Sequence, residues 1–422
     1  MEQISTLPAT VEQLLDGLPP LDDLVMASFR ENVALALAGG LAPETLRALK
    51  ADGLKFQRWC HARAASWLPA EPGVVKDFLQ EMAAAGKRPR RGGKATGYAP
   101  ATLDRFTASI RTWHVLAEMA PPTTSPKVKL ARKAHRRAIG STQRQATALT
   151  IDKLRRILDH IDAELQAISG RSASPAPTDR LKRLAALRDR ALLLTGYCTL
   201  ARGGELLALR WDDLHSDDHG DVVGTIRRSK TDQEGEGADQ HLWPSVFAAL
   251  SAWQIAHDAE LARCREEEAS RVEAIRRRRN PPRLWRTPRK AVPKQPVKLL
   301  WETSPFIFRG LKAARVGPRP ARGKVDLRVW HGWSPALSLR AFDTIIATRA
   351  KAAGLPSGSY SSHSLRIGAA QDLVAAGKSL PGIMQAGRWK TPQMVLRYVR
   401  KLLAGKSVMA EWGKVVEELS SP

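Results

Sequence analysis

The sequence is poor in the residues that would build a disulfide framework or a membrane span. Its 422 residues include only three cysteines, Cys60, Cys198 and Cys264. They form no C-x-x-C pair, which argues against a disulfide-stapled secreted protein and fits a reducing compartment. No run approaches the roughly 18 apolar residues that span a bilayer, and the N-terminus lacks the pattern of a signal peptide. We therefore expect a cytoplasmic protein without a membrane partner.

The motifs of several common chemistries are missing as well. The chain has no G-x-x-x-x-G-K-[ST] phosphate loop, no H-E-x-x-H zinc helix and no G-x-S-x-G nucleophile elbow. Asp and His residues gather between positions 212 and 221, but their order matches neither a calcium loop nor a zinc helix. A polar turn is the better interpretation of this segment. We expect neither a metal nor a cofactor.

Acidic residues are too few to balance the basic ones. The chain has 67 Lys and Arg against 42 Asp and Glu, a formal net charge of +25. This excess favours a polyanionic partner. Basic runs are often only solvated faces, but several separated runs suit contacts with phosphates on both sides of a duplex. The candidate DNA-binding residues are Arg47, Lys50, Arg58, Lys87, Arg88, Arg90, Arg91, Lys94, Lys129, Arg132, Lys133, Arg136 and Arg137.

Hydrophobic periodicity predicts a mainly α-helical protein with two domains. After a flexible tail over residues 1–23, residues 24–139 form a helical bundle, with helices from Pro43, from near Pro72 and from an N-cap at Thr102. Residues 140–149 are polar, which predicts a linker between the two domains. Residues 150–422 form a second, mostly helical domain, which opens at an N-cap at Thr150 and contains a small β-hairpin over 222–226 and 240–243.

Two segments of the second domain leave alternatives open. Residues 256–301 combine charged runs with a Pro-rich stretch, which predicts a long charged helix followed by an extended loop. This segment is a solvated insertion, an extra DNA or subunit contact, or a nuclear-import signal. A final amphipathic helix over about 406–420 packs either on its own domain or on a neighbouring protomer.

Two motifs near the C-terminus suggest a phosphate clamp with a tyrosine nucleophile. His363 and Arg366 are three residues apart and so share a helical face, at a point where a helix is expected to begin. Free amide groups at a helix start favour an anion. Tyr398 follows on a helix that begins near residues 391–392. We interpret the ligand as the scissile phosphodiester of DNA and the chemistry as cleavage by covalent attachment.

These motifs resemble those of the tyrosine site-specific recombinases, and most closely of their Cre-like members. The resemblance is carried by His-Ser-x-Arg-x-Gly-Ala-Ala at 363–370, Ile-Met-Gln-Ala-Gly-x-Trp at 383–389, Arg-Gly-Gly-Glu at 202–205 and Ser-Lys-Thr at 229–231. It extends into the N-terminal half around residues 67–72. The chain departs from the family at the 256–301 segment, where Cre-like enzymes are shorter.

The resemblance implies a role for each motif residue. Tyr398 is the nucleophile, and Arg202 and Arg366 hold the two non-bridging phosphate oxygens. Lys230 protonates the departing 5′ oxygen, and His363 donates to the phosphate or moves the proton of the nucleophile. Trp389 offers its indole N–H to a phosphate oxygen, and Glu205 orients an arginine or the histidine. The alternative interpretation of Arg202 and Glu205 is a simple ion pair within a helix, without a catalytic role.

The resemblance also implies a fold and a reaction. The fold is an N-terminal core-binding helical bundle joined to a C-terminal catalytic domain, which together clamp DNA in a C shape. The reaction is cleavage and rejoining of double-stranded DNA through a 3′-phosphotyrosyl intermediate and a Holliday junction. Monomers in solution would form a tetramer on two short inverted-repeat sites, in a bacterial, phage or plasmid context associated with the nucleoid. The alternatives are an integrase or resolvase that needs accessory factors, and a non-catalytic DNA-organising protein.

Overall fold

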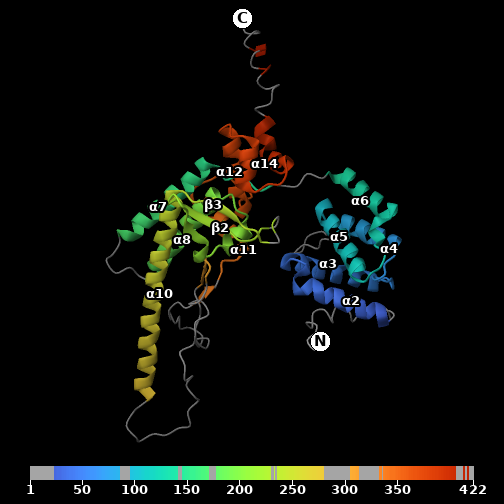
Figure 1. The fold of residues 1–422 in the computed structure, drawn as a ribbon, viewed down its shortest axis with the longest axis horizontal. Helices are drawn as coiled ribbons and strands as arrows, with labels where there is room; N and C mark the ends of the chain where they lie inside the picture. The colour runs from blue at the N-terminus through green and yellow to red at the C-terminus, as the bar shows by residue number, and fades with distance from the viewer. Residues whose placement is uncertain are drawn as a thin grey trace. The chain divides into compact units, whose positions relative to one another are not determined.

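The chain divides into two compact units. The computed structural model describes residues 23–85, 96–140, 145–170, 177–229, 232, 235–279, 305–312, 332–334, 336–404, 412–413 and 416–417. The boundary between the units falls between Arg144 and Gln145, inside the segment predicted as a linker. Figure 1 draws the elements of both units, which are described separately below. No helix in these ranges has the length and apolar character needed to cross a membrane.

Unit 1 is a bundle of helices. A π-helical turn at Ala36–Gly40 and a 3-10 turn at Pro122–Thr124 join some of them. The α-helices are α2 (Asp23–Leu35), α3 (Pro43–His61), α4 (Pro72–Ala85), α5 (Pro100–Leu116) and α6 (Pro126–Ile139). Several begin at a proline, whose fixed φ suits a first helical turn and whose missing N–H costs nothing there.

The start of α5 corrects one prediction. Thr102 was expected to cap this helix, but the helix begins at Pro100 and its N-cap is Ala99, which makes no side-chain capping bond. Thr102 therefore lies inside the first turn. The proline fixes the helix start more strongly than the threonine hydroxyl does.

Aromatic side chains dominate the core of unit 1. Phe78 of α4 packs edge-on against Phe56 of α3, with 5.0 Å between ring centroids, and also contacts Phe106 of α5. Trp67 and Trp113 make a second edge-to-face pair at 6.1 Å. All five are buried; the four on helices lie on apolar stripes at helical spacing, and Trp67 lies between α3 and α4.

Unit 2 is mostly helical with two small antiparallel sheets. One sheet has the order β1-β2-β3, with β1 at Leu214–Ser216, β2 at Val222–Ile226 and β3 at Ala238–His241. The other pairs β4 (Gly310–Lys312) with β5 (Gly332–Ser334). The helices are α7 (Ile151–Ser169), α8 (Pro177–Cys198), α9 (Gly203–Ala208), α10 (Pro244–Arg279), α11 (Leu339–Ala352), α12 (Ser362–Ala375), α13 (Leu380–Gly387) and α14 (Pro392–Ala404).

The predicted hairpin is present, with two differences. β2 has the predicted bounds, whereas β3 begins and ends two residues before the predicted 240–243. β1, β4 and β5 were not predicted. The predicted N-cap of α7 at Thr150 has the right place, although its side chain makes no capping bond. The fold class is therefore confirmed as mainly α with a small sheet.

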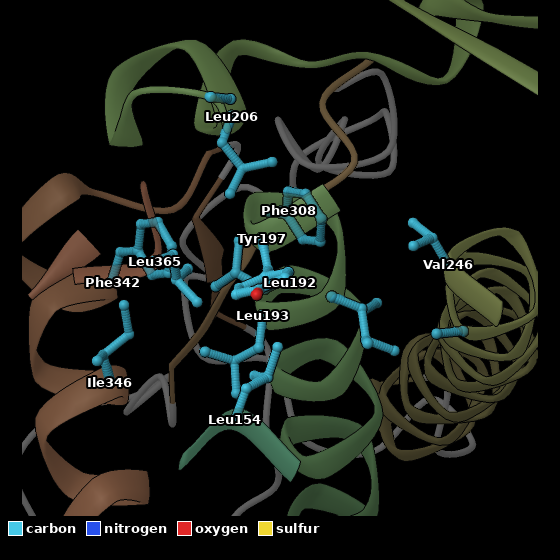
Figure 2. Close-up of a cluster of buried hydrophobic side chains, with 14 of the residues drawn as sticks. Leu154, Leu192, Leu193, Tyr197, Leu206, Val246, Phe308, Phe342, Ile346 and Leu365 are labelled. Atoms are coloured by element: carbon cyan, nitrogen blue, oxygen red, sulfur yellow. The ribbon is translucent and has the colours of Figure 1, made fainter. Parts of the chain in front are cut away.

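Helix α8 is the centre of the core of unit 2. It contacts α7, α10 and α12. Figure 2 shows Leu192, Leu193 and Tyr197 of α8 surrounded by apolar side chains from these helices, from α11 and from the segment that carries Phe308. Because α9 follows α8 directly, this packing fixes the start of α9 relative to α12.

The segment predicted as an insertion continues one long helix. Helix α10 starts at Pro244, and its first half is core, since Val246, Leu250 and Trp253 are fully buried. The helix runs to Arg279, while residues 280–301 lie outside the described residues. In the predicted C-terminal helix, residues 412–413 and 416–417 are described and helical, and the rest of 406–420 lies outside the described residues.

Candidate active site

Three separate segments of unit 2 bring the predicted catalytic side chains together. Arg202 and Glu205 lie at the start of α9, His363 and Arg366 in the first turns of α12, and Trp389 and Tyr398 before and within α14. Helix α12 packs against α8, α13 and α14. Because these contacts lie within one unit, the arrangement does not depend on how the two units are placed.

A glycine allows α9 to approach α12 closely. A Cβ added at Gly203 would lie 2.5 Å from Cδ1 of Leu339 and 2.8 Å from Oγ of Ser362, both too close for a real contact. A Cβ at the next residue, Gly204, would meet nothing within 4 Å. Gly203 is therefore required by packing, and the position of Arg202 depends on these neighbouring contacts.

Arg366 is the most deeply buried charge of the site. Its residue is 1% exposed, and its guanidinium donates hydrogen bonds to the carbonyl oxygens of Leu200 and Gly387. The guanidinium carbon lies 4.2 Å from the ring centroid of Trp389, a cation–π contact. Burial, and then the positive charges of Arg202 and Arg388, lower the pKa of Arg366 to about 10, so it stays charged at neutral pH. Two carbonyl bonds leave further N–H donors of the planar fork for a ligand.

Glu205 is a buried carboxylate that binds arginines. Its Oε1 accepts a bond of 2.7 Å from Nη1 of Arg202, and its Oε2 accepts bonds of 3.0 Å from the backbone N–H of Arg202 and from Nη2 of Arg388. Burial alone would raise the pKa of Glu205, but the bonds and charges of Arg202, with the charge of Arg388, lower it overall. Glu205 is thus ionised and contacts arginines, the first of the two partners predicted for it.

Tyr398 lies in an aromatic cluster with two other site residues. Its ring centroid is 5.3 Å from that of His363 and 5.7 Å from that of Trp389. Its backbone carbonyl accepts a 3.0 Å bond from Nε2 of Gln371 on α12. These contacts hold the α14 backbone and the phenol against the face of α12 that carries the arginine.

Trp389 carries a donor that lacks an acceptor. Its residue is 4% exposed, and its indole Nε1 is buried without a hydrogen-bond partner among the described residues. An unsatisfied buried donor is unfavourable, and in native structures such groups commonly mark a functional site. The indole N–H is therefore available to donate a hydrogen bond to an acceptor oxygen.

His363 is electrically neutral near pH 7. It is the second residue of α12 and is exposed. Partial desolvation of its ring, then the positive charges of Arg366 and Arg202, lower its pKa below the usual value of 6.5. A neutral imidazole beside a phenol can accept a proton as well as donate one.

The other tyrosines of the chain have different surroundings. The sequence has four tyrosines. The hydroxyl of Tyr197 donates a 2.5 Å bond to Oδ2 of Asp372, and burial followed by this carboxylate raises its pKa. Desolvation raises the pKa of Tyr360, and Tyr98 packs on Phe106 in unit 1. Tyr398 is the tyrosine whose ring packs against both His363 and Trp389.

Lys230 lies outside the described residues, but the turn on either side of it is described. Ser229 and Asp232 pair across the turn. The Asp232 carboxylate accepts backbone N–H bonds from residues 235–237. The bond from Gly237 is the main cause of its lowered pKa, and the charge of Lys390 contributes. Asp232 is therefore within electrostatic reach of Lys390, the residue that follows Trp389.

The acidic stretch at 212–221 is engaged in turn and ion-pair contacts. Asp213 binds Arg227, and Oδ1 of Asp217 accepts bonds of 2.9 Å from the backbone N–H groups of His219 and Asp221. Among the described residues, no group of three or more His, Cys, Asp or Glu could hold a metal ion.

One site residue was missed from the sequence. Arg388 occupies the variable position of the 383–389 motif, yet its side chain is 12% exposed and binds Glu205. It caps α13 in a left-handed conformation, with φ 54° and ψ 45°. Its sequence position gave no signal, because neither the backbone conformation nor the tertiary ion pair follows from the residue type.

The candidate DNA-binding residues of unit 1 fall into exposed and paired groups. On α6, Lys129, Lys133 and Arg137 are exposed at a spacing of four residues and so share one face. Arg132 and Arg136 of the same helix bind the carboxylate of Asp104 on α5.

The remaining predicted cations are in α3 or in an undescribed segment. On α3, Arg47 is exposed and ion-paired with Glu44, Lys50 is half-buried and Arg58 is exposed. The last group lies outside the described residues and comprises Lys87, Arg88, Arg90, Arg91 and Lys94.

Comparison with known proteins identifies the family of the chain. No family model matches it. It is 23% identical over 406 residues to the recombinase Cre of Escherichia phage P1, an alignment that covers 93% of this chain and 94% of Cre. The chain is a tyrosine recombinase. The resemblance predicted from the motifs is thus confirmed by a likeness along nearly the whole length.

Two further proteins are similar over different extents. An integrase/recombinase XerD homolog of Selenomonas ruminantium is 27% identical over 199 residues, 46% of this chain and 49% of the homolog. The crystal structure of the XerH site-specific recombinase bound to palindromic difH substrate covers 97% of this chain and 91% of XerH, with 14% identity and a TM-score of 0.49. As a tyrosine recombinase, the chain is an enzyme of DNA strand transesterification.

Proposed function

We propose that this recombinase cleaves and rejoins double-stranded DNA at a specific site, with Tyr398 as its nucleophile. One observation carries the proposal. Tyr398 of α14 packs on His363 of α12 and on Trp389, whose indole N–H is unsatisfied among the described residues, and Arg366 of α12 lies over the Trp389 ring. Arg202, from the start of α9, is close enough for its charge to lower the pKa of both Arg366 and His363. A tetrahedral phosphate offers acceptor oxygens in several directions, which suits a set of converging donors.

The residues account for each requirement of the reaction. The Tyr398 oxygen attacks phosphorus, the bond from phosphorus to the 5′ oxygen breaks, and a 3′-phosphotyrosyl ester forms. His363 is neutral and can take the phenolic proton, while Lys230 supplies the proton that the 5′ oxygen gains. Arg202 and Arg366 neutralise the charge on the non-bridging oxygens in the transition state. Attack by a 5′ hydroxyl then reverses these steps and rejoins a strand.

We assign duplex binding outside the cleavage site to unit 1. The exposed stripe of Lys129, Lys133 and Arg137 on α6 supports this role, because phosphate contacts position a protein without reading sequence. Unit 2 is then the catalytic domain. Monomers would assemble into a tetramer on two short inverted-repeat sites, and paired strand exchanges would pass through a Holliday junction.

The three cysteines are consistent with a protein that acts in a reducing environment. All are unpaired, and Cys60 and Cys264 are buried. Desolvation raises the pKa of Cys60 to about 12 and those of Cys198 and Cys264 to about 11. Thiols with raised pKa values react slowly, so these cysteines are structural.

The proposal is tested by trapping the covalent intermediate. The binding site is first selected from random or genomic duplexes, and a nick next to the cleavage position then lets the 5′ product diffuse away. The native chain should give a protein–DNA adduct that survives denaturant, and Tyr398→Phe should give none. Tyr360→Phe is the matched control and should form the adduct normally. Equal adduct from the Tyr398→Phe chain, or none from the native chain on its selected site, would overturn the proposal.

A further inference from the structure

Strained backbone gathers at the active site. Among the described residues, Ala64, Glu118, Leu200 and Arg388 are the non-glycine residues with positive φ. A side chain with a Cβ is disfavoured in this left-handed region. The two in unit 2 both lie beside Arg366, since the carbonyl of Leu200 accepts one of its bonds and Gly387, just before Arg388, accepts the other. Such strain persists where the surrounding structure requires it, often at functional sites.

At position 388 the strain is accompanied by a buried charge. Glycine would adopt φ 54° without steric cost, so the backbone conformation of the turn does not require an arginine. Its guanidinium donates a 3.0 Å bond to Oε2 of Glu205 and a long 3.4 Å bond to the carbonyl of Thr199. Its Nε is buried without a hydrogen-bond partner among the described residues. Position 388 therefore combines an unfavourable backbone with an incompletely satisfied cation.

The bond to Glu205 links this cation to Arg202. Both other bonds to the Glu205 carboxylate come from Arg202, one from its side chain and one from its backbone. Among the described residues, it is Arg388 that ties the same carboxylate to a different segment, the connection between α13 and α14. Without it, Glu205 and Arg202 would be anchored to each other and could shift together.

We infer that Arg388 is a positioning residue, which joins the α13–α14 connection to Glu205 and so holds Arg202 in a fixed position relative to Arg366. Residues 387–389 are then linked to both guanidinium groups of the clamp. Gly387 accepts from Arg366, Trp389 lies under it, and Arg388 is linked to Arg202 through Glu205. The inference rests on the proposed function, because it assigns Arg202 and Arg366 to one phosphate. Arg388 itself need not touch DNA.

Arg388→Gly is the sharpest test, because glycine suits the backbone at this position. The variant should fold and bind the selected DNA with a dissociation constant within twofold of the native one. Its single-turnover rate of adduct formation at saturating DNA should fall at least about tenfold, because small displacements of a catalytic group are costly. Ala64→Gly, which makes the same backbone exchange in unit 1, should keep the native rate. A rate within twofold of native for Arg388→Gly would overturn the inference.

A double variant tests whether the effect passes through Glu205. Glu205→Gln keeps the size of the side chain and removes its charge. If Arg388 acts through that carboxylate, adding Arg388→Gly to Glu205→Gln should slow the reaction less than twofold further. Independent effects, in which the two rate losses multiply, would contradict the inference.

A stability measurement separates failure of the inference from failure of the proposed function. If the native chain forms no adduct on its selected site, the proposed function fails. Urea midpoints of the native, single-variant and double-variant chains still decide the contact. Arg388→Gly should shift the midpoint by a different amount in the native and Glu205→Gln backgrounds. Equal shifts would overturn the proposed coupling even in an inactive chain.

Discussion

At the scale of single residues, the site combines a buried cation with a buried donor that lacks an acceptor among the described residues. Arg366 is fully buried, and among these residues its hydrogen bonds go to two backbone carbonyls and to no carboxylate. The Trp389 indole beneath it is the donor without an acceptor. Buried polar groups are normally paired, so the unsatisfied indole supports the proposed binding of an anion at this site.

The indole donor gives a direct prediction. Trp389→Phe keeps an aromatic ring beneath Arg366 and beside Tyr398 but removes the N–H. If the indole binds a phosphate oxygen, the rate of adduct formation should fall about tenfold or more, in line with the loss of one transition-state hydrogen bond. Denaturing gels of reactions quenched at successive times measure this rate. A native rate for the phenylalanine variant would show that Trp389 contributes packing alone.

Two adjacent glycines should respond in opposite ways to the same substitution. Gly203→Ala places a Cβ within 2.5 Å of Leu339 and should destabilise the protein by about 1–3 kcal/mol. It should also slow cleavage, because the start of α9 must move away from α12. Gly204→Ala, with open space around its Cβ, should be neutral or slightly stabilising. Urea unfolding gives the stability of each variant, and adduct formation gives its cleavage rate. Equal stabilities and rates for the two variants would contradict the close packing of Gly203 against Leu339 and Ser362.

At the scale of elements, sequence periodicity predicted what is long and repetitive. Helices α3, α4 and α7 have apolar stripes over three or more turns, and β2 is rich in β-branched residues and is followed by clear turn residues. β1, β4 and β5 have three residues each, which is too short for a periodic pattern of apolar residues to be recognised in the sequence.

The candidate catalytic residues were predicted from the sequence because their motifs resemble those of a known family. Arg388 was missed because both its left-handed backbone and its ion pair arise from tertiary packing.

The exposed face of α6 predicts a change in salt dependence. Replacing Lys129, Lys133 and Arg137 together by alanine should leave the fold intact, because all three side chains are exposed. Each lost phosphate contact should reduce the slope of log affinity against log salt by about 0.9. Fluorescence anisotropy over a salt series measures that slope. An unchanged slope would show that the duplex does not contact this face of α6.

Unit 1 should lose stability in acid through one buried histidine. Nε2 of His114 accepts a 2.9 Å bond from the Ala70 N–H, and its Nδ1 lies 2.8 Å from the carbonyl of Ile110, so the folded ring is neutral. Desolvation lowers its pKa below 6.5. The unfolded chain therefore takes up the proton first, and stability that is complete above pH 6.5 falls as the pH drops, by up to about 1.4 kcal/mol per pH unit.

Hydrogen exchange of peptides from α5 at pH 5 and pH 7.5 reports this loss. His114→Gln can accept from Ala70 and donate to Ile110 without titrating, and it should reduce the difference in protection between the two pH values. The same difference in the glutamine variant would assign the acid sensitivity to another group.

At the scale of the whole molecule, the proposed function gives the two units separate tasks. Unit 1 carries exposed cations on a helical bundle, and unit 2 holds the proposed nucleophile and phosphate donors around a single core. The likeness to Cre covers both units, since the alignment includes 93% of this chain. Strand transesterification conserves the energy of the broken bond in the tyrosyl ester, so this division of tasks suffices for cutting and rejoining.

The most direct test is to find which amino acid carries the DNA. The adduct formed on a nicked, selected site is digested with nuclease and trypsin, and the peptides are sequenced by mass spectrometry. The account predicts a nucleotide 3′-phosphate on the short peptide that contains Tyr398, which lies between the cleavage sites at Arg397 and Arg400. A nucleotide on Tyr98, Tyr197, Tyr360 or any serine, or one attached through a 5′ phosphate, would contradict it.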